Sequence, residues 1–309
     1  MDGAPQASHS HEFEFEAVTG FFMQDDPATD AETFDYVRSL KHNLGLLTRS
    51  YPADTDSANT RASEAPTQWQ RFTHRLARLN TPVPASPAIA YKLLYLARHG
   101  EGTHNVAEAF YGTPAWDAHW SKLPGNGTAS WADAPLTAVG EEQAREVHAF
   151  LGEQFAWAGM PVPAVWWVSP LWRCLQTARL TWEGLNLAGF APVVKELVRE
   201  TLGEHTCDRR STRTGIREGF PVWAIEDGFS EEDEFWRVDH RETHAEHDVR
   251  SRAILEELFA GLGGEGEQVV SFTAHSGTIA SVLRVVGHRE FRLPTGGVIP
   301  VLVKATRAR

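Results

Sequence analysis

The chain has 309 residues, of which 42% are hydrophobic and 23% are charged, a composition typical of one large globular domain or two small ones. Its formal net charge is −12, from 41 acidic and 29 basic residues, so we expect neither nucleic acid nor an anionic membrane as a partner. The two cysteines, Cys174 and Cys207, are too few for a disulfide framework and fit a reducing compartment. The N-terminal stretch lacks the features of a signal peptide, and no run of 18 apolar residues occurs. We therefore expect a cytoplasmic protein.

The first quarter of the chain is polar, with Pro, Asp, Ser and Thr scattered through it. A turn is predicted to lead into a first helix capped by Asp30 or Thr33, and residues 68–80 predict a second, amphipathic helix. The apolar content of this region is too small for an independent core. We therefore expect residues 1–90 to form an arm packed on a main domain of residues 91–309.

Short apolar strands alternate with helices along the rest of the chain. The predicted strands are 92–97, 164–168, 193–196, 268–274 and 298–303, and the predicted helices are 140–155, 171–185, 243–262 and 277–286. This alternation predicts an α/β fold whose mostly parallel sheet is covered by helices on both faces. Two long irregular stretches, 111–134 and 202–235, are expected to build a lid or binding surface. No glycine-containing segment has the setting of a dinucleotide site.

Polar residues follow four of the predicted strands at the edge where ligands bind in open α/β sheets. They are Arg98, His99 and Asn105 after the first strand, Arg173 after the second, Glu200 and Glu204 after the third, and His275, Ser276 and Gly277 after the fourth. Arginines and the free N–H groups of a helix N-terminus both bind phosphate. The sequence therefore predicts a phosphate pocket on one rim of an acidic protein.

His99 is the candidate nucleophile of this pocket. A neutral histidine with one exposed nitrogen can attack phosphorus in line, and Glu200 can supply the proton that the leaving oxygen needs. The charge of the transferring phosphoryl group would be balanced by Arg98, Arg173 and His275, so we expect no metal and no cofactor.

Four segments resemble motifs of the histidine phosphatase superfamily, which has the phosphoglycerate mutase-like fold. LARHGEGTHN resembles its R-H-G-x-x-x-x-N signature, SPLWRCLQTA its second arginine motif, LVRETLG the segment of its acid/base glutamate, and AHSGTI its second histidine. The phrases FDYVRSL, YGTPAWDAHWSKL and CDRRS are similar to a subgroup common in fungi. The resemblance implies a three-layer sandwich. It also implies catalytic roles for His99, Glu200 and His275, and phosphate binding by Arg98, Asn105, Arg173, Ser276 and Gly277.

Two assignments remain open on the sequence alone. Glu204 competes with Glu200 for the acid/base role, although Glu200 is favoured because it directly precedes the T-L-G turn. The arginines of the CDRRSTR stretch form either a second anionic subsite for the substrate or a set of surface ion pairs with nearby acids. They are Arg209, Arg210 and Arg213.

Two further groups of side chains have ambiguous patterns. His240, His244 and His247 have spacings that could suit a metal, but no further ligand motif accompanies them, so we interpret them as a solvated helix face. Three tryptophans of the first irregular stretch are expected either to pack in a core or to wall a substrate pocket. They are Trp116, Trp120 and Trp131.

Together these patterns predict a metal-independent phosphatase that works through phospho-His99 on a small phosphorylated metabolite. The same site would serve a mutase that returns the phosphoryl group to its substrate, if the pocket excludes water. The same anion pocket would also suit a repurposed non-hydrolytic enzyme or a binding module.

Overall fold

A computed structural model describes residues 11–34, 40–52, 65–82, 88–261 and 266–308. Seven strands form one sheet in the order β1-β7-β2-β6-β3-β4-β5. Four of the six neighbouring pairs are parallel, and the two pairs made by β7 are antiparallel, which confirms the predicted mostly parallel sheet. The strands are β1 (Phe13–Ala17), β2 (Ile89–Arg98), β3 (Val165–Val168), β4 (Pro192–Val194), β5 (Ala224–Ile225), β6 (Val269–Ala274) and β7 (Val298–Arg307).

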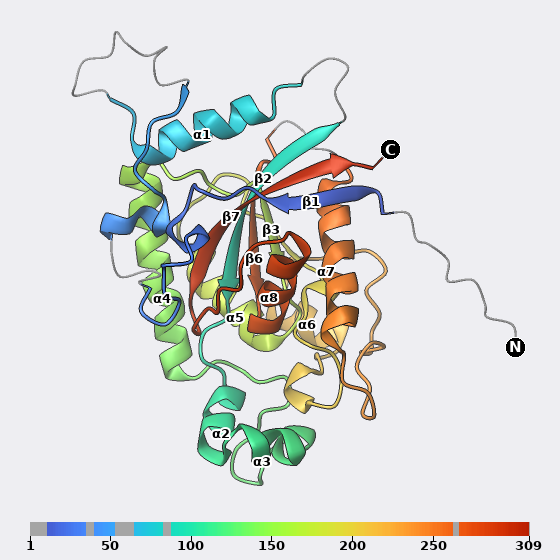
Figure 1. Cartoon of the computed structure of the whole chain (residues 1–309). Helices are drawn as coiled ribbons and strands as arrows, with labels where there is room; N and C mark the ends of the chain where they lie inside the picture. Colours follow the sequence, from blue (N-terminus) through green and yellow to red (C-terminus); the bar gives the residue numbers. More distant parts are fainter. Residues whose placement is uncertain (1–10, 35–39, 53–64, 83–87, 262–265, 309) are drawn as a thin grey trace, which may run out of the picture.

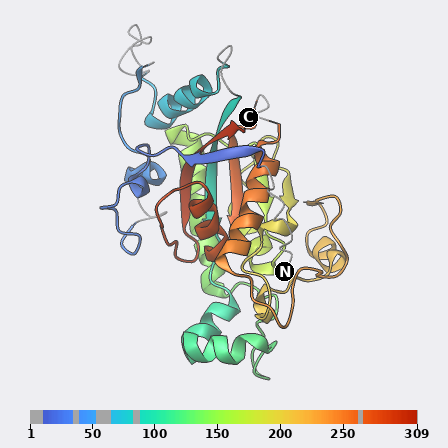
Figure 2. The same cartoon turned by 45° about the vertical axis from the view of Figure 1, so that its right-hand side comes forward.

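Helices cover both faces of the sheet, so the fold is the predicted three-layer α/β sandwich (Figures 1 and 2). Helices α1, α4 and α5 pack on one face, and α7 and α8 pack on the other. The helices are α1 (Gln68–Leu79), α2 (Thr103–Tyr111), α3 (Thr113–Ala118), α4 (Ala138–Glu153), α5 (Trp172–Trp182), α6 (Arg213–Gly219), α7 (His244–Phe259) and α8 (Ser276–Val285).

Strand β2 shows why the molecule has two cores. Side chains alternate between the faces of a strand, so Leu93 and Tyr95 enter the core under α4 and α5, whereas Leu94 and Leu96 enter the core under α7 and α8. All four are buried. Full burial of an apolar side chain of this size stabilises the fold by about 1.5–3 kcal/mol, so β2 is held in place from both sides.

The N-terminal region contributes to the sheet as well as packing on it. Strand β1, which the sequence did not predict, pairs antiparallel with β7 at the sheet edge. The predicted helix over residues 68–80 is present as α1, where the Thr67 hydroxyl accepts from the Gln70 N–H as N-cap. The helix predicted near Asp30 or Thr33 falls largely outside the described residues. The division of the chain near residue 90 stays a prediction.

The two stretches predicted to be irregular contain short elements. The first contains α3, and the second contains α6 and β5. Helices α2 and α3 project from the end of the sheet where β2 ends (Figure 1). They have a small core of their own that includes Trp116, Trp131 and Cys207, with Trp120 packed against it. Packing therefore accounts for most of the surface of these three tryptophans.

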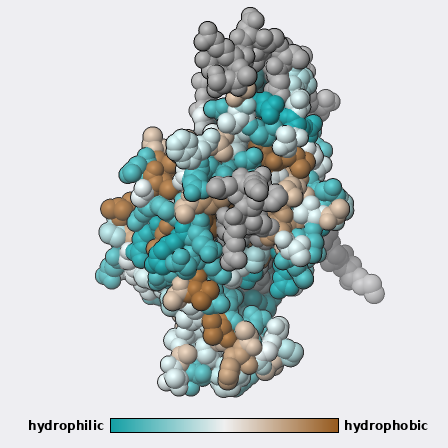
Figure 3. Space-filling view, turned by 90° about the vertical axis from the view of Figure 1, so that its left-hand side faces the viewer, coloured by the Kyte–Doolittle hydropathy of each residue, from teal (hydrophilic) through white to brown (hydrophobic). Residues whose placement is uncertain are grey.

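The face that carries α4 is largely hydrophilic, with separate hydrophobic patches (Figure 3). In the described parts of the chain, no helix combines the length and the apolar character needed to cross a membrane.

Candidate active site

His99 directly follows strand β2 at the rim of the sheet, and the residue is 1% exposed. Its Nδ1 lies 2.7 Å from the carbonyl oxygen of Gly100. A carbonyl can only accept, so this nitrogen carries the hydrogen, and a neutral ring has its lone pair on Nε2. Gly100 is required here because a Cβ would lie 2.2 Å from the Gly140 carbonyl oxygen. The hydrogen bond to the Gly100 carbonyl thus selects the tautomer of His99.

The surroundings of His99 keep its ring neutral. Burial and then the nearby charges of Arg173 and Arg98 lower the pKa of His99 well below its ordinary value, and the Gly100 hydrogen bond opposes them only partly. A neutral imidazole retains the lone pair that a nucleophile needs.

Arg98 and Arg173 both offer donors to an anion. Nη1 of Arg98 donates to the Leu293 carbonyl at 2.8 Å. Arg173 is 1% exposed, with Nη1 donating to the Cys207 carbonyl at 2.6 Å and Nη2 to Asp208 Oδ1 at 2.9 Å. In both arginines Nε is buried and has no hydrogen-bond partner among the described residues. A buried donor of this kind is costly unless a ligand satisfies it.

Glu200 lies at the N-terminus of α8. Its Oε2 accepts from the Gly277 N–H at 3.1 Å and from the Ser276 hydroxyl at 3.3 Å. A Cβ on Gly277 would lie 2.0 Å from Glu200 Oε1, so glycine lets the carboxylate approach the helix end. Glu204 instead pairs with Lys122 at 3.0 Å and is not among the residues that line the cavity. The geometry therefore favours Glu200 for a role in chemistry.

Asn105 and His275 complete the predicted set. Oδ1 of Asn105 accepts from the Gly102 N–H at 2.9 Å, which leaves its amide nitrogen as a donor at the cavity. His275 is fully buried, with its ring centroid 5.1 Å from that of His99 and Nε2 2.7 Å from Ser169 Oγ.

The predicted charge on His275 is not supported. Burial and then the charge of Arg173 hold the pKa of His275 well below its ordinary value. His275 is therefore a neutral neighbour of His99 rather than a cation. It lies behind the cavity wall and is not among the lining residues.

A cavity of about 290 Å³ joins most of these side chains. Of the three tryptophans expected to pack in a core or wall a pocket, Trp116 lines this cavity as well as packing in the small core. The wall also includes residues that the sequence did not single out: His104, Glu108, Asp117, Thr201, His205, Cys207, Asp208, Arg241 and Arg292. Asp208 comes from the second long stretch and Arg241 follows that stretch in the chain, and the two form an ion pair of 2.8 Å. The CDRRS motif marks this segment in the sequence, and Asp208 is its aspartate.

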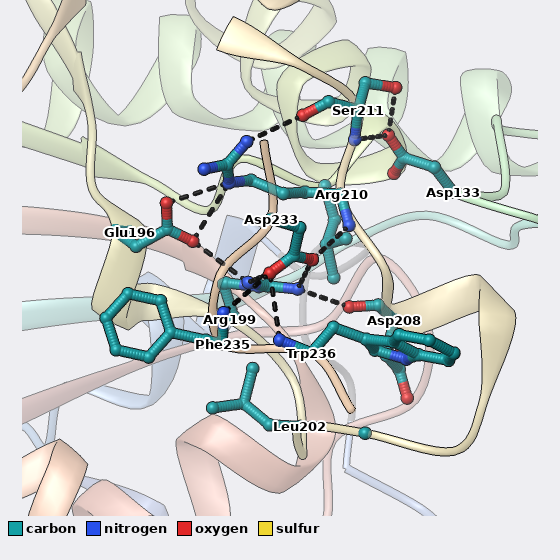
Figure 4. Close-up of polar contacts among 12 residues, drawn as sticks. Asp133, Glu196, Arg199, Leu202, Asp208, Arg210, Ser211, Asp233, Phe235 and Trp236 are labelled. Atoms are coloured by element: carbon teal, nitrogen blue, oxygen red, sulfur yellow. Dashed lines mark hydrogen bonds and ion pairs between the residues drawn. The ribbon is translucent and has the colours of Figure 1, made fainter. Parts of the chain in front are cut away.

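The three arginines proposed for a second anionic subsite lie outside the lining of this cavity. Arg210 is buried and donates to Glu196 at 2.8 Å (Figure 4). It also donates to the carbonyls of Ser230 and Glu232. The ion-pair interpretation thus describes Arg210, although the pair is buried rather than on the surface. The guanidinium carbon of Arg209 lies 5.3 Å from the centroid of the Trp236 ring. Arg213 is the first residue of α6.

The solvated histidine face was predicted correctly for His240 and His244 but not for His247. His247 is buried 3.6 Å from Glu242, and burial lowers its pKa to about 3. It is a packed core histidine because α7 turns this face toward the 197–202 segment, where Arg250 holds the carbonyls of Leu197 and Arg199.

One trio in the described residues has metal-binding atom types, namely His205, Cys207 and Asp208, whose ligand atoms lie within 4.8 Å of one another. Both oxygens of Asp208 already accept from arginines, Arg173 and Arg241. Burial raises the pKa of the Cys207 thiol well above its ordinary value, so the thiolate that a metal needs is disfavoured. The trio is therefore a poor cation site.

The sequence profile of the histidine phosphatase superfamily (branch 1) matches residues 94–293, which include all the side chains described around the cavity. The chain belongs to this superfamily. Its members are enzymes, either phosphatases or mutases, that act on small phosphorylated substrates.

Two relatives of this chain are named as probable mutases. A probable phosphoglycerate mutase of Arthroderma benhamiae is 44% identical over 298 residues, covering 94% of this chain and 84% of the relative. A probable phosphoglycerate mutase of Saccharomyces cerevisiae is 39% identical, covering 69% of this chain and 79% of its own. Among solved structures, a mycobacterial glucosyl-3-phosphoglycerate phosphatase aligns at 24% identity with a TM-score of 0.38, covering 64% of this chain and 82% of that one. The resemblance to phosphoglycerate mutase-like proteins of fungi is confirmed.

Proposed function

We propose that the protein is a metal-independent phosphatase that transfers the phosphoryl group of a small phosphorylated metabolite first to His99 and then to water. The observation that carries the proposal is the state of His99. Its Nδ1 is bound to the Gly100 carbonyl, and its pKa is held well below the ordinary value, so Nε2 has a lone pair at a cavity lined by arginines.

The proposed reaction has two steps. In the first, Nε2 of His99 forms a bond to phosphorus while the ester P–O bond breaks, and Glu200 in its acid form gives its proton to the leaving oxygen. In the second, water attacks the phosphohistidine as the Glu200 carboxylate takes a proton from it, and the N–P bond breaks. Inorganic phosphate leaves, and both side chains return to their starting forms.

The arginines supply the positive charge that this reaction needs. Arg98 and Arg173 line the cavity together with His99 and Glu200, and Nε of each arginine is buried without a partner among the described residues. Oriented donors of this kind stabilise the charge of a phosphoryl transition state without reorganisation. We therefore expect activity to persist in the presence of a chelator.

A mutase is the second candidate, because the relatives described above are named probable phosphoglycerate mutases. The two reactions share the first step. They differ in whether water or the bound product takes the phosphoryl group from His99.

The test is a panel of small phosphate esters incubated with the protein in EDTA and followed by 31P NMR. A phosphatase releases inorganic phosphate, whereas a mutase yields a positional isomer of the ester with little free phosphate. The variant His99→Ala is the control and should do neither. A binding module would leave every ester unchanged in the wild-type protein, and that result would refute the proposal.

A further inference from the structure

The segment Cys207–Ser211, which contains the CDRRS motif, has no role in the reaction proposed above, yet it contacts Arg173 twice. The Cys207 carbonyl and the Asp208 carboxylate accept from the two Nη atoms of Arg173, at 2.6 and 2.9 Å. These two hydrogen bonds fix the orientation of the planar Arg173 guanidinium as well as its position.

The same segment holds the start of helix α5, on which Arg173 is the second residue. Oδ1 of Asp133 accepts from the Trp172 N–H at 2.8 Å. Its Oδ2 accepts from the N–H and the hydroxyl of Ser211, at 2.8 and 2.6 Å (Figure 4). Both the backbone that carries Arg173 and its side chain are therefore tied to one stretch of five residues.

Asp208 also binds a second arginine of the cavity. Its Oδ2 accepts from Nη1 of Arg241 at 2.8 Å, so one carboxylate is shared by two guanidinium groups that line the same wall. Burial disfavours the charge on Asp208, but Arg241 and Arg173 outweigh it and keep the pKa of the carboxyl below its ordinary value. The pair of arginines retains a surplus positive charge after this carboxylate is counted.

The backbone of Asp208 is anchored on the side away from the cavity. Its carbonyl accepts from Nη2 of Arg199 at 2.7 Å, and Arg199 is held by Asp233 at 2.5 and 2.7 Å (Figure 4). Neither Arg199 nor Asp233 lines the cavity. Asp208 thus links a rigid buried network to the two cavity arginines.

We propose that Asp208 is a positioning residue, whose carboxylate fixes Arg173 and Arg241 as an oriented pair that binds the phosphoryl group of the substrate. The inference deepens the proposed function and rests on it for the identity of the anion. Asp208 itself takes no part in bond making or breaking.

The substitution Asp208→Asn distinguishes three roles of Asp208, because each role predicts a different change in phosphate affinity. Asparagine has one acceptor oxygen and an NH2 donor, so it can hold only one of the two guanidinium groups. A positioning role predicts weaker phosphate binding, whereas a role limited to charge predicts tighter binding, because the cavity gains a positive charge. A role limited to folding leaves the affinity unchanged and lowers only the thermal stability.

The experiment is calorimetric titration of the full-length protein with inorganic phosphate, without turnover, beside thermal unfolding of each variant. Asp208→Asn should weaken phosphate binding at least tenfold. The matched control Asp248→Asn also removes an arginine-bound carboxylate, which pairs with Arg284 away from the cavity lining, and it should lower stability while leaving the phosphate affinity within about twofold.

Asp208→Glu keeps the charge but moves the carboxylate by one methylene group, and it serves if the asparagine variant does not fold. We expect it too to weaken phosphate binding severalfold. Phosphate affinity at the wild-type level in the glutamate variant, or tighter binding in the asparagine variant, would overturn the inference alone. Phosphate binding that depends on Asp208 in a protein that converts no ester would overturn the proposed function alone.

Discussion

Two groups of arginines meet at Asp208 and differ in how their charge is balanced. Arg199 and Arg210 contact two carboxylates, Glu196 and Asp233, so the buried network has equal numbers of charges of each sign. Of the cavity arginines Arg98, Arg173 and Arg241, the last two form ion pairs, both with the carboxylate of Asp208.

Among the described residues, no carboxylate lies within ion-pair distance of Arg98. The three cavity arginines therefore have one ion-paired carboxylate between them, whereas Arg199 and Arg210 have two. An Nε without a partner does not distinguish the two groups, because Arg199 has one as well as Arg98 and Arg173. Residue type alone thus does not mark an anion site. A group with fewer ion-paired carboxylates than arginines does, because guanidinium groups that are already paired have little to gain from an added phosphate.

The two groups should respond differently to the loss of the planar guanidinium. Arg173→Lys keeps the charge but loses the geometry, and we expect kcat on p-nitrophenyl phosphate to fall by about 10²–10³-fold. Arg210→Lys should lower the midpoint of thermal unfolding and leave kcat within about threefold, because Arg210 does not line the cavity. Equal losses of kcat in two folded variants would refute the division.

The two glutamates Glu200 and Glu204 allow a similar contrast between a cavity residue and a paired one. Glu200→Gln should slow the hydrolysis of alkyl phosphates by about 10²-fold while largely sparing p-nitrophenyl phosphate, whose leaving group needs no proton. Glu204→Gln is the matched control, since its carboxylate pairs with Lys122 away from the cavity lining, and it should treat both substrates alike. A selective defect in the Glu204 variant would show that Glu204, not Glu200, is the general acid.

Gly277 gives a smaller and purely steric test. A Cβ at this position would meet Glu200 Oε1 at 2.0 Å, so Gly277→Ala should displace the carboxylate and lower kcat/KM for alkyl phosphates about tenfold. Gly261→Ala, where a Cβ meets nothing within 4 Å, is the control for adding a methyl group. Unchanged kinetics in Gly277→Ala would show that the position of Glu200 at the end of α8 is not required.

The smallest effect is on stability at acid pH. Burial, followed by the charge of Arg173, lowers the pKa of His104 well below its ordinary value, whereas the unfolded chain takes up this proton near pH 6.5. The free energy of unfolding is therefore highest above that pH and falls as the pH drops below it. The fall is at most about 1.4 kcal/mol per pH unit for each such histidine.

His104→Gln should reduce the pH dependence of the free energy of unfolding by the contribution of one histidine. Urea unfolding at pH 7.5 and pH 5.5 measures it, with His74→Gln on the exposed face of α1 as the control for loss of a histidine. Identical pH dependence in the wild-type protein and His104→Gln would contradict the assignment of His104 as neutral in the folded state.

The sequence predicted the parts of the site that lie directly after strands. Arg98, His99 and Arg173 follow apolar runs within a few residues, so the order of strands and helices alone places them at one edge of the sheet. Glu200 was found for the same reason, since it follows β4 and a short turn.

Local sequence patterns could not predict contacts between residues that are far apart in the chain. Asp208 and Arg241 are 33 residues apart, and only the path of the loop between them brings their side chains to 2.8 Å. Strand β1 was missed because its alternating FEFEA pattern lies in a polar region where no core was expected, and its stability comes from pairing with the far end of the chain. His247 was misjudged because the side of α7 that faces the 197–202 segment is itself polar.

The chemical identity of the intermediate decides whether His99 is the nucleophile. The protein is mixed with a phosphate ester that it turns over, quenched in alkaline denaturant within the first turnover, and analysed by peptide mass spectrometry. We predict a phosphoryl group that is stable to alkali and labile to acid, located on His99 and absent from the variant His99→Ala. A phosphoryl group on another residue, or normal turnover by the folded His99→Ala variant, would contradict the proposed mechanism.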